Sequence, residues 1–259
     1  MLPRRLRPTR RRAKSSDKHV GMNRPIPRMG RFFVSTDRSL SPRRRPWQTR
    51  AVFEEAHLPS AEFWYEFAST YSYPAALRVA ALADERGVSL VWCPFLLGPI
   101  FFAQGWRDSP FNVYPAKGRY MWRDLERTCG AMGVPLKRPE PFPQPSLLAA
   151  RVALALEHPE RSDFSRRVFV AEFGQGLPIG DRATLGALLE ECGVEPIATF
   201  ERAQGHANKA RLKAECARAA EIGIIGAPCL VTADGEVFWG NDRLEQGLDW
   251  AAGGANPVP

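Results

Sequence analysis

EFWYEFASTYSYPAALRVAALADERGVSLVWCPF, residues 62–95, is the stretch that decides the fold. Its aromatic start, residues 62–67, is typical of a buried strand. Pro74 suits the first turn of a helix, and an apolar stripe of helical period follows until Gly87 in C-cap position. Residues 89–95 favour a second buried strand. Strand, helix and strand in this order predict a β-α-β unit with a right-handed crossover.

The residues that follow carry helical patterns interrupted by Gly and Pro. They predict helices over 117–132, 146–158, 161–174, 181–192 and 206–221. Five prolines between Pro135 and Pro145 predict an extended connector. Strand character returns at 229–232 and 237–239, around a turn that favours a hairpin, and a last helix follows. The order β-α-β, helices, β-β-α is an α/β, thioredoxin-like layout opened in the middle.

Three parts are predicted from this pattern. They are a disordered basic tail over 1–58, a thioredoxin-like domain from 59–95 and 206–255, and a helical insertion domain over 96–205. Residues 1–50 hold 16 basic and 2 acidic side chains, whereas the rest holds 20 basic and 26 acidic. The net charge of +8 therefore belongs to the tail, and a nucleic-acid partner is not expected for the folded part.

The basic tail has three interpretations. It is a polyanion-binding arm, a transit-like peptide, or the product of a start codon assigned too early, with Met22 and Met29 as internal alternatives. The last interpretation, or an inert tail, is favoured because charge runs are usually only solvated.

Cysteine usage and apolar runs limit the compartment. The five cysteines form no C-x-x-C pair and no His/Cys cluster, so reduced thiols, a cytoplasmic location and no metal site are expected. The longest apolar runs are shorter than the ~20 residues of a spanning helix, so no membrane is expected. The cysteines are Cys93, Cys129, Cys192, Cys216 and Cys229.

Serine occupies both positions where a thioredoxin fold places its redox cysteines. The segment is Ser69-Thr70-Tyr71-Ser72, between the first strand and the first helix. A hydroxyl cannot exchange disulfides, but at a helix N-terminus it can donate a hydrogen bond to a thiolate that a ligand brings. The alternative is that Ser69 and Ser72 only cap the helix, and spacing alone favours the cap.

Gly226-Ala227-Pro228 directly precedes the third strand. Proline cannot donate to a strand ladder, so it belongs at a strand start or in a special bend. A cis Ala227-Pro228 bond would turn the backbone groups of Ala227 toward the Ser69 helix end, where they could pair with a cysteine-containing peptide. A trans proline in an ordinary loop is the commoner alternative.

Two further segments offer polar side chains. Asn241 and Asp242 precede the last helix, whose free N–H groups suit a carboxylate, while Asp242 suits an ammonium group. Together they fit an amino-acid head group, and simple capping by either residue is equally compatible. In the predicted insert, Lys117 could meet an acidic ligand group, although a lone lysine is usually solvated.

Taken together, these motifs resemble the 2-hydroxychromene-2-carboxylate isomerase and kappa-class glutathione transferase family, a DsbA-like branch of the thioredoxin fold. The resemblance covers about residues 61–252. It rests on FASTYSY at 67–73, PAKGRYMWRDLER at 115–127 and IGAPCLVTADGEVFWGNDRLE at 225–245. Two positions depart from the family pattern, Thr70 in place of proline and Glu66 in place of aspartate, and they hint at a subfamily with another substrate.

The resemblance implies glutathione as the cofactor. Ser69 corresponds to the serine that stabilises the glutathione thiolate, and Ala227-Pro228 to the cis bond that pairs with the tripeptide backbone. The other implied glutathione-binding positions are Ser72, Lys117, Asn112, Asn241 and Asp242. Arg243 shares the last motif without an assigned role.

The activity that the resemblance implies is glutathione-dependent isomerisation of 2-hydroxychromene-2-carboxylate or a related aromatic-catabolism intermediate, with Ser69 catalytic. A kappa-type glutathione transferase and a non-catalytic thioredoxin-fold peptide-binding protein are the alternatives. The expected partner is a small aromatic electrophile, and a homodimer is compatible with the sequence. Candidates to line an aromatic pocket, which core packing explains equally well, are Phe101, Phe102, Trp106 and Phe111.

Overall fold

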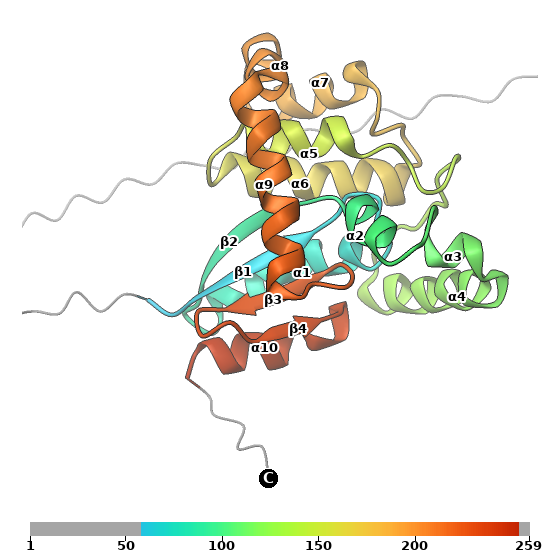
Figure 1. Ribbon diagram of the computed structural model, residues 1–259, viewed down its shortest axis with the longest axis vertical. Helices are drawn as coiled ribbons and strands as arrows, with labels where there is room; N and C mark the ends of the chain where they lie inside the picture. The colour runs from blue at the N-terminus through green and yellow to red at the C-terminus, as the bar shows by residue number, and fades with distance from the viewer. Residues whose placement is uncertain (1–57, 254–259) are drawn as a thin grey trace, which may run out of the picture. The chain divides into compact units, whose positions relative to one another are not determined.

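A mixed four-stranded sheet lies at the centre of residues 58–253, which the computed structural model describes (Figure 1). The strand order is β2-β1-β3-β4. The strands are β1 (Ser60–Tyr65), β2 (Ser89–Pro94), β3 (Cys229–Thr232) and β4 (Val237–Trp239). The predicted basic tail lies outside the described residues, apart from Leu58.

The strand pairing follows the predicted order of elements. β1 pairs with β2 in parallel and with β3 antiparallel, and β3 pairs antiparallel with β4. Helix α1 (Ser72–Asp84) joins β1 to β2, which gives the predicted β-α-β unit. The β3–β4 hairpin turns at Gly235, whose φ of 88° lies in the left-handed region that glycine tolerates best.

The remaining helices are more numerous than predicted. They are α2 (Leu97–Ala103), α3 (Pro110–Val113), α4 (Pro115–Met132), α5 (Leu147–Leu154), α6 (Glu160–Phe169), the π-helical turn η1 (Val170–Gln175), α7 (Arg182–Glu191), α8 (Pro196–Gln204), α9 (His206–Ile222), the 3-10 turn η2 (Asn241–Arg243) and α10 (Leu244–Ala251). The predicted helices match α4, α5, α6 with η1, α7 and α9. Three helices, α2, α3 and α8, were not predicted. The division into two folded domains stays a prediction.

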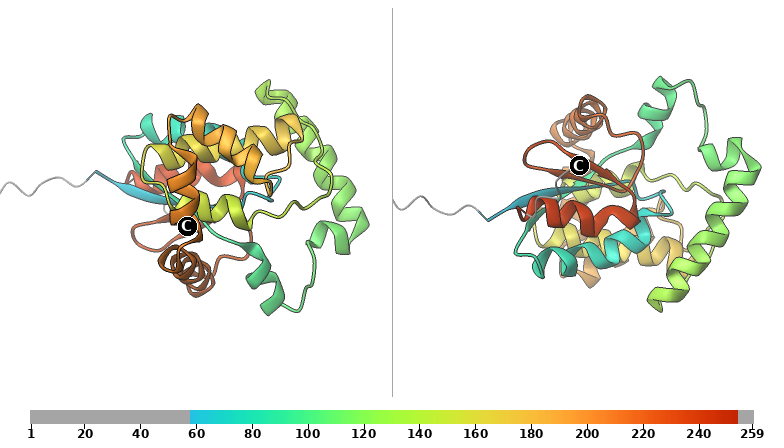
Figure 2. Two further views of the ribbon diagram at one scale, coloured as in Figure 1. Left: turned by 90° about the horizontal axis from the view of Figure 1, so that it is seen from above. Right: turned by 90° about the horizontal axis from the view of Figure 1, so that it is seen from below.

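Helices cover both faces of the sheet. α1 and α10 pack side by side on one face, and α9 packs on the opposite face (Figure 2). α5 contacts β2, and α6 contacts α1 and α5. α4 projects to one side of the sheet and meets the rest of the fold near the first turn of α1 (Figure 2).

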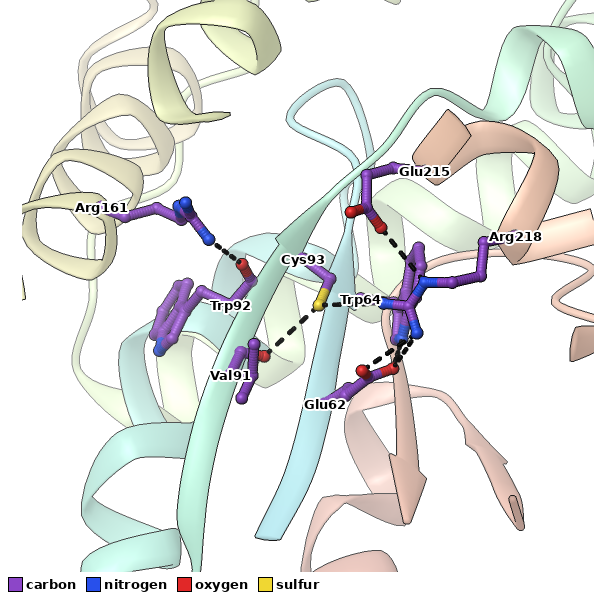
Figure 3. Close-up of polar contacts among 8 residues, drawn as sticks. All are labelled: Glu62, Trp64, Val91, Trp92, Cys93, Arg161, Glu215 and Arg218. Atoms are coloured by element: carbon purple, nitrogen blue, oxygen red, sulfur yellow. Dashed lines mark hydrogen bonds and ion pairs between the residues drawn. The ribbon is translucent and has the colours of Figure 1, made fainter. Parts of the chain in front are cut away.

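The central strand β1 is buried on both faces. Tyr65 packs its ring 5.9 Å from that of Phe169 on α6, and its hydroxyl lies 2.7 Å from Ser165 Oγ. On the other face, the Arg218 guanidinium of α9 lies 4.4 Å from the Trp64 ring and donates two 3.0 Å hydrogen bonds to the Glu62 carboxylate (Figure 3). This network attaches α9 to the sheet.

A buried arginine joins α6 to β2 and to the end of α5. Arg161 is 8% exposed and donates to the Trp92 carbonyl at 3.3 Å (Figure 3). It also donates to the Leu156 carbonyl at 2.6 Å. Backbone carbonyls therefore satisfy its donors. Within residues 58–253, no helix is both long and apolar enough to cross a membrane.

Candidate functional site

The serine turn, residues 66–72, connects β1 to α1. The Ser69 N–H donates to the Glu66 carbonyl at 3.0 Å, and the Ser72 N–H donates to the Ser69 carbonyl at 3.1 Å. The Ser69 hydroxyl donates to the Ala227 carbonyl at 2.9 Å, 158 residues away in sequence. It accepts only a long 3.4 Å contact from the Ser72 N–H, so capping is not its main interaction.

The Ala227-Pro228 bond is cis, as the family resemblance implies, and not trans, which is the commoner case. The Ala227 N–H donates to no acceptor among the described residues. The Gly240 N–H donates to the Pro228 carbonyl at 2.9 Å, which places η2 beside this bend. Trp239 is half exposed, and its indole lies so close to Gly226 that a Cβ there would meet its Nε1 at 2.6 Å.

The start of α1 offers backbone donors next to Ser69. The helix begins at Ser72, and the N–H groups of Thr70 and Tyr71 donate to no acceptor within residues 58–253. Free N–H groups at a helix N-terminus carry partial positive charge and favour an anion. The Ser69 hydroxyl and these donors are therefore suited to stabilising a thiolate.

Ser72 differs from what the family resemblance implies for it. Its side chain is fully buried inside α1, and its Oγ has no hydrogen-bond partner within the described residues. A hydroxyl in this place cannot contact a ligand at the surface. Ser72 is the first residue of α1, and its side chain is buried there.

Asn241 and Asp242 occupy η2, not the cap of a regular helix. α10 begins only at Leu244, and neither side chain caps it. Asn241 Oδ1 is buried and has no hydrogen-bond partner within residues 58–253, whereas Asp242 is exposed. The predicted capping is therefore wrong, and Asn241 Oδ1 is an acceptor that a ligand N–H group would satisfy.

Helix α4 contacts the serine turn through two side-chain pairs. The Thr70 hydroxyl donates to Met121 Sδ at 3.1 Å, and the Tyr71 hydroxyl donates to Asp124 Oδ2 at 3.1 Å. Burial and the Asp124 charge raise the pKa of Tyr71, so the phenol stays protonated. Sequence reasoning gave Tyr71 and Asp124 no role, although both stand in the quoted motifs.

Two predicted binding residues lie near α4 without a described contact to Ser69. Lys117 is exposed on the same face of α4 as Met121, one turn away, and its Nζ lies 4.8 Å from the Tyr114 ring centre. Asn112 donates its amide to the Asp108 carboxylate at 3.2 Å and to the Phe142 carbonyl at 3.3 Å. The Asn112 amide is thus already hydrogen-bonded to other residues of the protein.

Aromatic side chains lie on the short helices that follow β2 and in the loop between them. The ring of Phe101 lies 5.6 Å from that of Trp106, and the ring of Phe111 lies 6.4 Å from that of Tyr71. Phe102 is 69% exposed. Core packing therefore does not account for Phe102, while Phe111 stands beside the serine turn.

The thiol next to the bend is shielded. Cys229 is buried, its Sγ donates to the Gly226 carbonyl at 3.2 Å, and burial raises its pKa to about 12. It is therefore a neutral thiol and a poor nucleophile. The site combines hydroxyl and N–H donors with no ionised cysteine among the described residues.

Comparisons with known proteins agree with this geometry. Residues 61–249 match the family model of the DSBA-like thioredoxin domain, which confirms the predicted α/β thioredoxin-like fold. The 2-hydroxychromene-2-carboxylate isomerase of Sphingobium xenophagum is 28% identical over 185 residues, 71% of this chain and 93% of that protein. Glutathione S-transferase kappa 1 of Homo sapiens is 27% identical over 204 residues, 72% and 88% of the two chains.

A solved structure gives the same relationship. A 2-hydroxychromene-2-carboxylate isomerase superposes with a TM-score of 0.67 at 25% identity, covering 75% of this chain and 94% of its own. The predicted resemblance is therefore confirmed at the level of a distant relationship.

Proposed function

This chain belongs to the DSBA-like thioredoxin domain family, and on that premise we propose that it is a glutathione-dependent isomerase of 2-hydroxychromene-2-carboxylate or a related aromatic-catabolism intermediate. One observation carries the proposal. The Ser69 hydroxyl stands at the start of α1 within 2.9 Å of the Ala227 carbonyl, with serine at both positions of the redox pair. Such a site can hold a thiolate but cannot itself exchange disulfides.

The residues present fit glutathione as the cofactor. The free N–H groups of Thr70 and Tyr71 lie at the N-terminal end of α1, where an anion is favoured. The free Ala227 N–H offers a donor to a peptide carbonyl, and the unpaired Asn241 Oδ1 offers an acceptor to an ammonium or amide group. These groups match the thiolate, peptide backbone and amino-acid end of a tripeptide.

Each residue has a separate task in this mechanism. Bound glutathione would supply a thiolate that adds reversibly to the conjugated substrate. Ser69 releases the Ala227 carbonyl and donates its hydrogen bond to the sulfur, which favours the ionised form. Tyr71, tied to Asp124, holds α4 against the serine turn, and Phe111, whose ring lies 6.4 Å from that of Tyr71, is the candidate contact for an aromatic substrate.

Product analysis tests the proposal. The purified full chain is incubated with 2-hydroxychromene-2-carboxylate and a limiting amount of glutathione, and both are followed with time. We expect many turnovers per glutathione with the thiol recovered unchanged. Substrate left unconverted while glutathione binds would contradict an isomerase of this substrate class.

A kappa-type glutathione transferase is the second candidate. The human glutathione S-transferase kappa 1 supports this candidate, because it is 27% identical to this chain, whereas the Sphingobium xenophagum isomerase is 28% identical. The same assay with a model electrophile such as 1-chloro-2,4-dinitrobenzene distinguishes them. A stable thioether and stoichiometric loss of glutathione would indicate the transferase.

A further inference from the structure

Glu66 directly follows β1, and its carboxylate is buried within the serine turn. The side chain is 5% exposed. Its Oε1 accepts from the Ala68 N–H at 3.3 Å, and its Oε2 accepts from the Leu97 N–H at 2.9 Å. Burying a carboxylate without partners would be costly, and here each oxygen receives one backbone N–H group. The two partners belong to different segments, since Leu97 lies 31 residues after Glu66.

The first contact divides the backbone donors of the serine turn into two pairs. The Ser69 N–H donates to the Glu66 carbonyl at 3.0 Å, and the Ala68 N–H donates to the Glu66 carboxylate. The next two N–H groups, those of Thr70 and Tyr71, have no acceptor within residues 58–253. Glu66 therefore satisfies the donors that come first, and the donors next to α1 stay free for an anion.

The second contact attaches α2 to the serine turn. α2 begins at Leu97, and the side chain of its N-cap residue, Leu96, makes no capping hydrogen bond. The Leu96 N–H donates to Cys216 Sγ of α9 at 3.4 Å, and the Leu97 N–H donates to Glu66. Glu66 thus supplies the side-chain acceptor that the N-cap residue of this helix lacks.

We propose that Glu66 is a positioning residue for the candidate site, with each carboxylate oxygen holding one of two segments. The contact with Ala68 keeps Ser69 and the free N–H groups in place for an anion. The contact with Leu97 keeps α2 against the serine turn. An amide of the same size cannot replace this carboxylate, because its nitrogen is a donor and cannot accept from a second N–H group.

Amide hydrogen exchange of the full chain, measured by NMR, tests both contacts without a ligand. In E66Q a single side-chain oxygen remains, so the N–H of Ala68 or of Leu97 loses its acceptor. Because a hydrogen bond to a charged group is strong, exchange at one or both amides should be faster by about tenfold or more. Unchanged exchange at both amides would overturn the proposal.

Glu195 provides a matched control at the start of α8. Its carboxylate also accepts from two backbone N–H groups, those of Ile197 at 2.8 Å and Ala198 at 2.7 Å, and α8 packs on α5, α7 and α9. E195Q should make exchange faster at the start of α8 and leave the serine turn and α2 unchanged. Equally fast exchange in the serine turn of E195Q would show a general loss of stability and would remove the support for a local role.

Glu66→Asp separates the two contacts. An aspartate can accept from the N–H group two residues later in an Asx turn, so the bond to Ala68 should persist. Its shorter side chain should no longer reach Leu97, so exchange should become faster at Leu97 alone. This variant keeps the proposal testable if E66Q does not fold. Faster exchange at Ala68 with no change at Leu97 would disprove the assignment of the two contacts.

The effect on a bound thiolate rests on the proposed function. Glu66→Ala removes both acceptors, so the pKa of bound glutathione should rise by up to about one unit, since the Ser69 hydroxyl is retained but no longer held in place. In E66D and E195Q this pKa should equal that of the unmodified chain. An unchanged pKa in Glu66→Ala would show that Glu66 does not position Ser69. Failure of the unmodified chain to bind glutathione would count against the proposed function alone, because hydrogen exchange needs no ligand.

Discussion

At the residue scale, the two serines of the turn lie three positions apart in sequence and differ in exposure and hydrogen bonding. Ser69 is partly exposed and donates to a carbonyl of another segment, whereas Ser72 is fully buried with an unpaired hydroxyl. The hydroxyl of Ser69 therefore makes a stabilising hydrogen bond, whereas burial of the unpaired Ser72 hydroxyl is destabilising.

Replacing Ser69 by alanine should weaken thiolate binding at the proposed site. A hydrogen bond to a charged group contributes about 1.5–3 kcal/mol, so in Ser69→Ala the pKa of bound glutathione should rise by about one to two units, with a modest loss of glutathione affinity. Titration of thiolate absorbance measures it. A pKa equal to that of the unmodified chain would show that Ser69 does not contact the sulfur.

Ser72→Ala is the matched variant. It removes a buried hydroxyl without a partner and should leave the glutathione pKa unchanged while stability stays equal or increases. Urea unfolding measures the second effect. A clear loss of stability would mean that Ser72 has a partner in solution.

The residue scale is also where sequence reasoning was weakest. FASTYSY and the Ala227-Pro228 bend were assigned to one site because a cis bond there would turn the Ala227 backbone groups toward the Ser69 helix end. The sequence did not predict that Glu172 is buried without a hydrogen-bond partner among the described residues, since this depends on how η1 packs in the core. The contacts of Arg161 were not predicted either, because its acceptors are backbone carbonyls that no side-chain pattern records.

At the element scale, α4 is positioned by the close approach of its first turn to α3. Gly118 is buried there, and a Cβ at this position would lie 2.3 Å from the Phe111 carbonyl oxygen. Gly130, near the other end of the same helix, is exposed and has nothing within 4 Å of such a Cβ. Gly118 is therefore required by its close contact with α3, whereas the position of Gly130 has space for a side chain.

Alanine at these two glycines should therefore have opposite effects. Gly118→Ala forces backbone to move and should lower the free energy of unfolding by about 1–3 kcal/mol. Gly130→Ala should raise it by up to about 1 kcal/mol, because alanine is the better helix former. Denaturant unfolding of both variants measures this. Equal effects of one sign would contradict the close contact between α3 and α4.

Helices and strands were predicted correctly where the spacing of apolar residues agreed with the positions of the flanking Gly and Pro residues. The hairpin strands were predicted at their observed bounds, and α9 differs from its prediction by one residue. No helix was predicted at α3 or α8, although Pro110 and Pro196 each occupy the first helical turn after a capping residue, Ser109 and Glu195.

At the scale of the whole molecule, residues 1–50 carry a positive net charge and the rest of the sequence carries a negative one. Residues 1–50 carry nearly half of the Lys and Arg, and the part that matches the family model begins at residue 61. Family membership and the candidate site thus belong to the acidic remainder.

Truncation tests whether the basic segment contributes. A chain beginning at Phe53 carries 20 basic and 26 acidic residues, so its net charge reverses sign to −6. It should lose retention on a polyanion column while its unfolding midpoint and proposed activity stay unchanged. Loss of activity on truncation would assign the basic segment a role in the reaction.

The shielding of the thiols has a consequence for the proposed glutathione-dependent reaction. Cys229 stands beside the bend, yet burial and its contact with the Gly226 carbonyl keep it protonated, and within residues 58–253 only Cys192 is not buried. Under the proposed function, an electrophile bound beside Ser69 would find the Cys229 thiol buried and neutral, so the protein is protected from alkylation at Cys229 while glutathione supplies the reacting sulfur.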